Sequence, residues 1–178
     1  MVAWPEKTIE KEAERKEIVF KTKHVTGMDL SSTSKMLAIY NNEECEVSFW
    51  NYDLLKLYEV VTFDAPVTNV LMAEELSLVV VVTGEGSISL LKYTKTENSL
   101  GLEVVGEFCL QEMGSKNKNL QNCSLKIAKE GHCYALYFGS SRGALTKVDL
   151  TEILTTHFPG YKIPTPIKEP ISIFRCQR

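Results

Sequence analysis

One short run in this chain of 178 residues has the spacing of a hydrolytic site. Gly139-Ser-Ser-Arg-Gly143 matches the Gly-x-Ser-x-Gly nucleophile elbow, in which a sharp turn between a strand and a helix exposes a serine hydroxyl. Asp149 and His157 follow in the order serine, aspartate, histidine that α/β hydrolases use. In a small serine hydrolase, Ser141 would be the nucleophile, His157 the base and Asp149 the group that orients the base.

Three observations argue against this hydrolase. The residues after Gly143, Ala-Leu-Thr-Lys-Val-Asp, contain β-branched residues and no helical stripe, whereas an elbow runs straight into a helix. Asp149 and His157 are only eight residues apart, which leaves little room for the separate loops that these groups normally occupy. No glycine-rich loop upstream offers an oxyanion hole, and the alternating helices of an α/β sheet are missing from the pattern. We therefore predict no catalytic residue, and a turn between two strands explains the glycines.

The remaining chemical signals are weaker. Gly84-Glu-Gly86 lacks the third glycine and the following helix of a dinucleotide site, so it predicts a hairpin turn. His24, His132 and His157 lie far apart, without the spacing of metal ligands. We predict no metal site and no cofactor. The five cysteines are an odd number without paired spacing, which indicates reduced thiols in a cytosolic or nuclear protein.

The elements that would position these residues are short strands. From Glu17 onward, β-branched and aromatic runs alternate with Gly, Asn, Ser and Asp, which is typical of an all-β domain. The longest apolar run, Leu76–Val82, has the length of a strand and is far shorter than the roughly 18 to 20 residues of a membrane-spanning helix. The predicted strands are Ile18–Lys21, Val25–Leu30, Met36–Tyr40, Val47–Tyr52, Glu59–Phe63, Val67–Met72, Leu78–Thr83, Ser87–Tyr93, Glu103–Leu110, Ser124–Ala128, Tyr134–Phe138 and Ala144–Val148.

These strands repeat as a unit. A triplet that starts at Val25 recurs at Val67, with an offset of about 41 to 42 residues, and a third triplet follows about 57 residues after the second. A fourth strand comes from the run before each next triplet, namely Ile18–Lys21, Glu59–Phe63 and Glu103–Leu110. A repeat of about 40 to 45 residues with four short strands indicates a β-propeller blade.

The end of the third copy resembles the WD-repeat family. Val148-Asp149 stands where that family has its Trp-Asp dipeptide, and Trp50-Asn51 and Leu91-Lys92 take the same place in the other copies. The family's Gly-His pair, and the buried Asp that would bond to that His, are missing throughout, so the repeats are degenerate. The resemblance covers about residues 17 to 150, with a further blade starting at Ile171. It implies a non-enzymatic scaffold or adaptor that holds protein partners on propeller loops.

Three or four blades do not close the usual ring of about seven. We therefore expect either a longer propeller of which this chain is a part, or another chain that completes the ring, because an open stack exposes blade faces. Within the stack, Phe49 and Trp50 point to opposite faces of one strand. Both residues are predicted to form the core between blades, as are Tyr134 and Tyr137.

Three segments organise the chain. Residues 1–16 form a charged leader that is helical or disordered, and residues 17–157 form the blades. Residues 158–178 are a Pro-rich segment that leads into a further blade and acts either as a linker between blades or as a surface arm for a partner. Just before this segment, residues 151–157 are expected to form one or two helical turns.

Composition restricts the partners. A net charge of -3 and a charged fraction of 24% show no basic excess, so no nucleic-acid partner is expected. We expect no signal peptide at the N-terminus and no membrane insertion. The prediction is a cytoplasmic protein, with a nuclear, cytoskeletal or ciliary setting as alternatives, and its partners are other proteins.

Overall fold

The computed structural model describes residues 24–96, 99–109, 124–139 and 145–163. This part of the chain contains eleven strands, one short 3-10 turn and one α-helix, so the protein is all-β, as the sequence predicts. The strands are β1 (Gly27–Ser31), β2 (Met36–Asn41), β3 (Glu46–Asn51), β4 (Lys56–Thr62), β5 (Val67–Ala73), β6 (Leu78–Thr83), β7 (Ser87–Lys95), β8 (Leu100–Cys109), β9 (Ser124–Glu130), β10 (Cys133–Gly139) and β11 (Leu145–Asp149), and the helical elements are η1 (Glu74–Leu76) and α1 (Leu150–His157).

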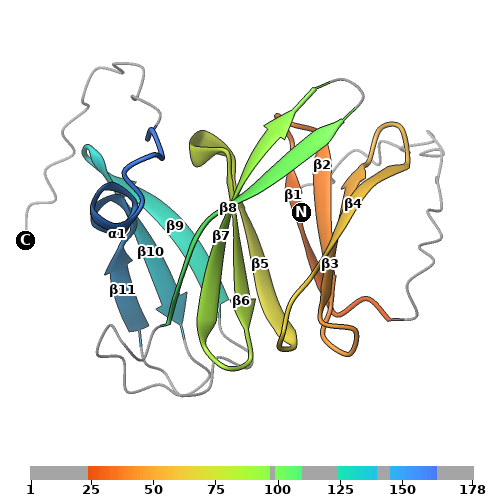
Figure 1. Cartoon of the computed structure of the whole chain (residues 1–178), viewed down its shortest axis with the longest axis horizontal. Coiled ribbons are helices and arrows are strands. Elements are labelled where there is room, and N and C mark those ends of the chain that lie inside the picture. The colour runs from red at the N-terminus through yellow and green to blue at the C-terminus, as the bar shows by residue number, and fades with distance from the viewer. Residues whose placement is uncertain (1–23, 97–98, 110–123, 140–144, 164–178) are drawn as a thin grey trace, which may run out of the picture.

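The strands form three antiparallel sheets, which we call blades 1, 2 and 3. Blade 1 has the order β1-β2-β3-β4, blade 2 the order β5-β6-β7-β8, and blade 3 the order β9-β10-β11. Figure 1 shows the blades side by side, with blade 2 in the middle. Strand β1 contacts β5, and β5 contacts β9, so the first strands of successive blades adjoin. This is the arrangement of a partial β-propeller.

The repeat predicted from the sequence corresponds to these blades. Eleven of the twelve predicted strands coincide with a strand of the structure, with ends that differ by a few residues. The predicted fourth strands Glu59–Phe63 and Glu103–Leu110 become the outer strands β4 and β8. The predicted strand Ile18–Lys21 and the further blade at Ile171 lie outside the described residues. Among the residues described after β11, helix α1 follows where blades 1 and 2 have a fourth strand.

Strand β6 of blade 2 explains why the sequence contains a continuous apolar run. All six of its residues are buried. Leu78, Val80 and Val82 belong to the core between blades 2 and 3. Val79 and Val81 point the other way and belong to the core between blades 1 and 2. A sheet covered on both faces needs apolar residues at successive positions, because neighbouring side chains alternate between the faces.

Helix α1 seals the core between blades 2 and 3. The Asp149 carboxylate accepts a hydrogen bond from the backbone N–H of Glu152 at 2.9 Å, which caps the helix. Leu150, Ile153 and Leu154 are buried in the core that these two blades share. The predicted helical turns are thereby confirmed.

The segment after α1 returns to blade 2. Phe158 lies directly over Gly106 of β8, where an added Cβ would come within 1.9 Å of the Phe158 ring. Tyr161 is 8% exposed, and its hydroxyl donates to the backbone carbonyl of Leu76. Burial raises the pKa of Tyr161 to about 12. The described start of the Pro-rich segment, up to Ile163, therefore packs on a blade of its own chain.

Candidate interaction surfaces

The described residues on either side of the elbow-like run belong to two paired strands. Gly139 ends β10 and Leu145 begins β11, and these two residues pair across antiparallel strands. Residues 140–144, which include Ser141, lie outside the described residues. A strand rather than a helix follows them, so the strand-to-helix turn that exposes a nucleophile is missing. Asp149 caps α1, and for His157 only the backbone, at the end of α1, is described.

One face of blade 1 is apolar across all four strands. Met28 pairs with Ile39, and Leu30 pairs with Leu37. Leu37 pairs with Trp50 on β3, and β4 continues the row. Directly paired residues share one side of a sheet, so these side chains form one surface. We call it the open face, and it consists of Met28, Leu30, Leu37, Ile39, Trp50, Leu57 and Val60, with the buried Ser48 between Ile39 and Val60.

Four residues of the open face are exposed, while Leu37 and Ile39 on β2 are buried, at 7% and 2% exposure. Met28 is 62% exposed, Leu30 49%, Val60 43% and Leu57 42%. None of these four side chains belongs to either of the two buried cores of the described chain. Large exposed hydrophobic residues gather in blade 1 and its turns, where seven of the nine in the described chain lie: Val25, Met28, Leu30, Leu54, Leu55, Leu57 and Val60. An apolar patch of this kind indicates a surface for another macromolecule.

A shallow hollow of about 270 Å³ lies on the open face. Ile39, Trp50, Leu57 and Val60 line it, with Glu44 and Glu46 among its polar residues. The Trp50 indole N–H donates to the Ser48 hydroxyl at 3.0 Å, so the polar atom of the tryptophan is satisfied within the sheet.

The outer face of blade 3 is polar instead. We call it the polar face, and it carries Lys126, Glu130, Tyr137 and Lys147. The Lys147 ammonium lies 2.5 Å from a Glu130 carboxylate oxygen and 5.8 Å from the centre of the Tyr137 ring. The Tyr137 hydroxyl donates to the other Glu130 oxygen. The hydrogen bond from Lys147 lowers the pKa of Glu130, and the same bond raises the pKa of Lys147.

The prediction that four aromatic residues form the core between blades is confirmed for Phe49 and Tyr134. It is wrong for Trp50 and Tyr137. Phe49 is fully buried and Tyr134 is 3% exposed, both between blades. Trp50 and Tyr137 are only half-buried. Both lie on the outer faces of end blades, which no further blade covers in the part of the chain that the structure describes.

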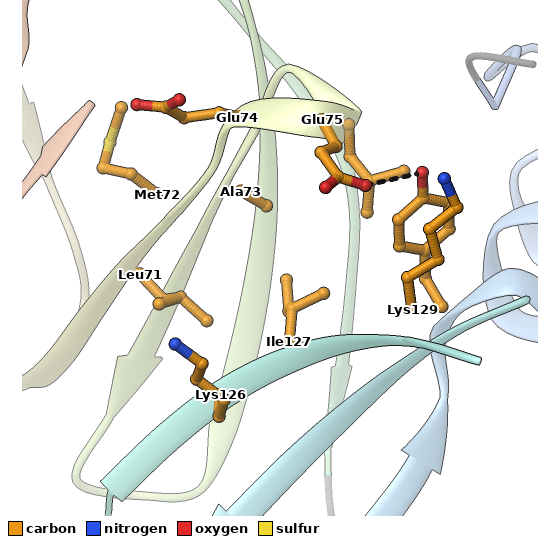
Figure 2. A pocket seen from close by; sticks show the side chains of 10 residues that line it. Leu71, Met72, Ala73, Glu74, Glu75, Lys126, Ile127 and Lys129 are labelled. Carbon is orange, nitrogen blue, oxygen red and sulfur yellow. Dashed lines mark hydrogen bonds between the residues drawn. The ribbon is translucent and has the colours of Figure 1, made fainter. Parts of the chain in front are cut away.

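A second kind of surface lies where neighbouring blades meet. Figure 2 shows a hollow of about 280 Å³ between blade 2 and β9. Leu71 and Ile127 contribute apolar side chains, and Lys129 approaches from β9. The Tyr134 hydroxyl donates to the Glu75 carboxylate at 3.1 Å. Burial raises the pKa of Tyr134, and the hydrogen bond to Glu75 adds to this shift.

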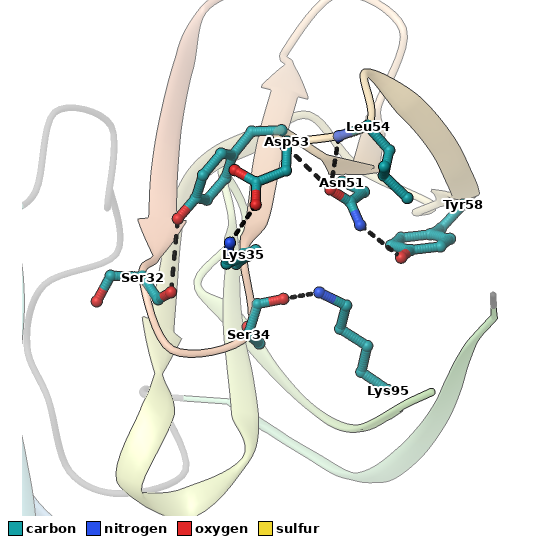
Figure 3. Close-up of polar contacts among 9 residues, drawn as sticks. Ser32, Ser34, Lys35, Asn51, Asp53, Leu54, Tyr58 and Lys95 are labelled. Carbon is teal, nitrogen blue, oxygen red and sulfur yellow. Dashed lines mark hydrogen bonds and ion pairs between the residues drawn. The ribbon is translucent and has the colours of Figure 1, made fainter. Parts of the chain in front are cut away.

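Hydrogen bonds link blade 1 to blade 2 at the same end of the sheets. The hydroxyl and the N–H of Thr33 both donate to the Glu74 carboxylate, at 2.7 and 3.3 Å. The Thr33 hydroxyl lowers the pKa of Glu74. Figure 3 shows the Lys95 ammonium from β7 donating to the backbone carbonyl of Ser34. These bonds hold the turn of blade 1 against blade 2, so the junction is a fixed surface.

No family model and no curated protein matches the sequence. Among solved structures, the chain is similar to the WD40 domain of SCAP from fission yeast, with 9% identity and a TM-score of 0.49 over 76% of this chain and 34% of that one. It is also similar to the Cps50 (Swd1) β-propeller domain of Myceliophteria thermophila, with 11% identity and a TM-score of 0.46 over 70% of this chain and 40% of that one. A luciferin-regenerating enzyme matches with 12% identity and a TM-score of 0.38 over 69% of this chain and 44% of that one. The chain thus spans about a third of the length of the SCAP domain.

Neither a membrane-spanning helix nor a cluster of metal ligands is present among the described residues. No helix there is both long enough and apolar enough to cross a membrane. No group of three or more His, Cys, Asp or Glu side chains there is arranged to hold a metal ion.

Proposed function

We propose that this chain is a non-enzymatic interaction module of the β-propeller type that binds protein partners. The observation that carries the proposal is the open face of blade 1. Because its exposed residues are 42 to 62% exposed, burial of the remaining apolar surface by a partner would contribute about 1 kcal/mol for each side chain.

The rim at the junctions of the blades supports a scaffold role as a second contact region. Glu74 and Glu75 on the η1 turn, with Lys95 at the end of β7 and Lys129 near the end of β9, present both signs of charge at the edge of the sheets. Loops on a rigid scaffold are common binding sites. The free thiols Cys45, Cys109 and Cys133 are compatible with the proposed cytoplasmic setting, and a nuclear or cytoskeletal setting is the alternative.

The test compares the proteins that the tagged full chain retains from a cell extract. The variant carries Leu57→Lys and Val60→Lys, which place two charges on the open face. The matched control is Leu145→Lys, because Leu145 is an apolar residue of blade 3 that is 71% exposed. We expect a partner that the wild type and the control retain and that the double variant loses. Equal retention by all three chains would refute the open face as the binding surface.

The hydrolase hypothesis has its own direct test. A fluorophosphonate probe labels an activated serine covalently, so a hydrolase would be labelled at Ser141 and would lose the label in Ser141→Ala. We expect no such labelling. Labelling that disappears in the variant would replace the scaffold proposal.

A further inference from the structure

A cleft of about 820 Å³ lies between blades 1 and 2, beside the end of β7. We call it the β7 cleft. The turn between β1 and β2 forms one wall, η1 contributes to a second, and the last residues of β7 form a third. Figure 1 shows the hairpin of β7 and β8 extending past β6 towards blade 1. Leu100 and Leu102 of this hairpin pack against the core between blades 1 and 2, so the wall that β7 provides is held in place.

One edge of β7 is unpaired where it borders the β7 cleft. Strand β6 pairs with β7 only as far as Lys92, and the Tyr93 N–H still donates to the Ser77 carbonyl at 3.0 Å. Strand β8 continues along the other edge to the end of β7. Backbone groups of alternate residues point to the same edge of a strand, so those of Lys95 point to the edge that Tyr93 uses, away from β8. No strand of the described chain pairs with that edge at Lys95.

The charge of the β7 cleft is positive. Lys35, Lys92 and Lys95 line it, and Glu74 is the one carboxylate among the described residues of its lining. The Glu74 carboxylate already accepts two hydrogen bonds from Thr33. The chain as a whole has a net charge of -3, so this concentration of lysines runs against the overall charge.

Two of these lysines have no acidic partner. Lys35 is paired with Asp53. Neither Lys92 nor Lys95 forms an ion pair with another residue that the structure describes. Figure 3 shows the Lys95 ammonium donating to a neutral group instead, the backbone carbonyl of Ser34. Its positive charge is therefore available to an anionic group that enters the cleft.

We infer that the β7 cleft binds an extended acidic segment of a protein partner, which adds as a short strand to the unpaired edge of β7 and places a carboxylate beside Lys95. This inference rests on the proposed function and adds a second binding surface, distinct from the open face. In strand addition, the main-chain hydrogen bonds provide affinity and the alternate side chains provide specificity.

Strand β8 shows in the same molecule which kind of segment pairs with β7. It places Glu103 opposite Lys92. It also places Glu107 opposite Ser89, whose hydroxyl donates to the Glu107 carboxylate at 2.9 Å. The unpaired edge presents both an N–H donor and a carbonyl acceptor at Lys95, and a peptide backbone matches both. The phosphate backbone of a nucleic acid offers acceptors alone, so a peptide fits this edge better.

The test measures the affinity of the full chain for a dye-labelled peptide of ten residues in which Glu and Val alternate, by fluorescence anisotropy. Lys95→Gln removes the charge but retains an amide donor for the Ser34 carbonyl. We expect this variant to bind the peptide about fivefold more weakly, since an exposed charge pair is lost. The matched control is Lys162→Gln, because Lys162 is an exposed lysine on the segment after α1, and its affinity should be unchanged. Equal affinities of all three chains, or no binding at all, would overturn the inference.

Two further readouts test the strand pairing itself. A peptide of the same sequence with N-methylated backbone amides cannot pair as a strand and should bind about tenfold more weakly, because main-chain hydrogen bonds are lost. The unmodified peptide should slow hydrogen exchange of the Lys95 backbone N–H about tenfold, as measured by NMR. Equal affinity of the two peptides, with unchanged exchange at Lys95, would show that no strand is added.

Other occupants give different results. A DNA strand of ten nucleotides that binds more tightly than the peptide and loses affinity in Lys95→Gln would make a nucleic acid the occupant and overturn the inference. A dimer, detected by light scattering, that dissociates in Lys95→Gln and persists in Lys162→Gln would do the same for a second copy of the chain. If the peptide does not bind while the extract partner still depends on Leu57 and Val60, the inference about the β7 cleft is wrong and the proposed function stands.

Discussion

Blades 1 and 3 are the two end sheets of the described stack, and their outer faces differ in kind. Blade 1 leaves Met28, Leu30 and Leu57 more than two-fifths exposed. Blade 3 covers the corresponding surface with the contacts among Glu130, Tyr137 and Lys147. In repeat proteins, a terminal unit with a polar outer face acts as a cap that keeps the stack soluble. Blade 3 has the chemistry of such a cap, and blade 1 has the chemistry of an interior unit.

The two blades differ in their outer faces and not in their inner faces. Both blades bury their inner faces in the same way. Phe49 of blade 1 and Leu136 of blade 3 are each fully buried against blade 2. The stability of both blades therefore depends on their inner faces, while the outer face is free to become an interface or a cap. The following substitutions test this division.

The largest effect should come from the inner face of blade 1. Phe49→Ala removes a fully buried ring and should lower the free energy of unfolding by about 3 to 5 kcal/mol. The adjacent Trp50→Ala, on the open face, should cost clearly less, because Trp50 is only half-buried. Urea denaturation of both variants measures the difference. Equal losses would mean that the open face is as much a part of the core as the inner face.

The next prediction concerns the segment after α1, in which Phe158 packs over Gly106 of blade 2. Gly106→Ala places a methyl group within 1.9 Å of the Phe158 ring, and we expect a loss of about 1 to 3 kcal/mol. Gly101→Ala is the matched control on the same strand, because its Cβ would meet nothing closer than 3.7 Å. The thermal midpoints of both variants provide the measurement. An unchanged midpoint in Gly106→Ala would show that Phe158 is not held against blade 2.

A smaller effect is expected at the cap of α1. Asp149→Ala removes the acceptor for the Glu152 N–H and should cost about 1 kcal/mol. Asp149→Ser retains an acceptor oxygen and should recover most of that loss. Denaturation midpoints compare the three chains. If alanine and serine behave alike, the carboxylate does not cap the helix.

The last prediction is confined to alkaline pH. The pKa of Tyr161 is about 12 in the folded protein and about 10 in an unfolded chain, so only the unfolded chain loses this proton between those values. Stability from this group is complete below pH 10 and is lost as the pH rises towards 12. Tyr161→Phe should therefore show a shallower fall in stability over that window, measured by urea denaturation at a series of pH values. Parallel curves would place Tyr161 in water.

Much of this architecture follows from local sequence. Strands β2, β3, β6 and β7 are predictable because β-branched and aromatic runs end at turn residues, and the offset between Leu37 and Val79 reveals the repeat. The Gly139–Gly143 run is also interpretable from the residues alone, since the β-branched residues that follow it disfavour a helix. The three strands of blade 3 and the helical turns of α1 are also predictable, but the sequence does not show that α1 packs into the core between blades 2 and 3.

The amino-acid sequence alone determines that short strands form, that they recur as a repeated unit, and which side chains share one side of a strand. It does not determine which side is covered, because alternation assigns Phe49 and Trp50 to opposite faces without saying which face meets another sheet. That assignment depends on contacts between residues far apart in the chain, such as the hydrogen bond from Met72 to Asp29. Only the tertiary structure therefore separates the buried Val79 from the uncovered surface around its repeat partner Leu37, and that uncovered surface carries the proposed function.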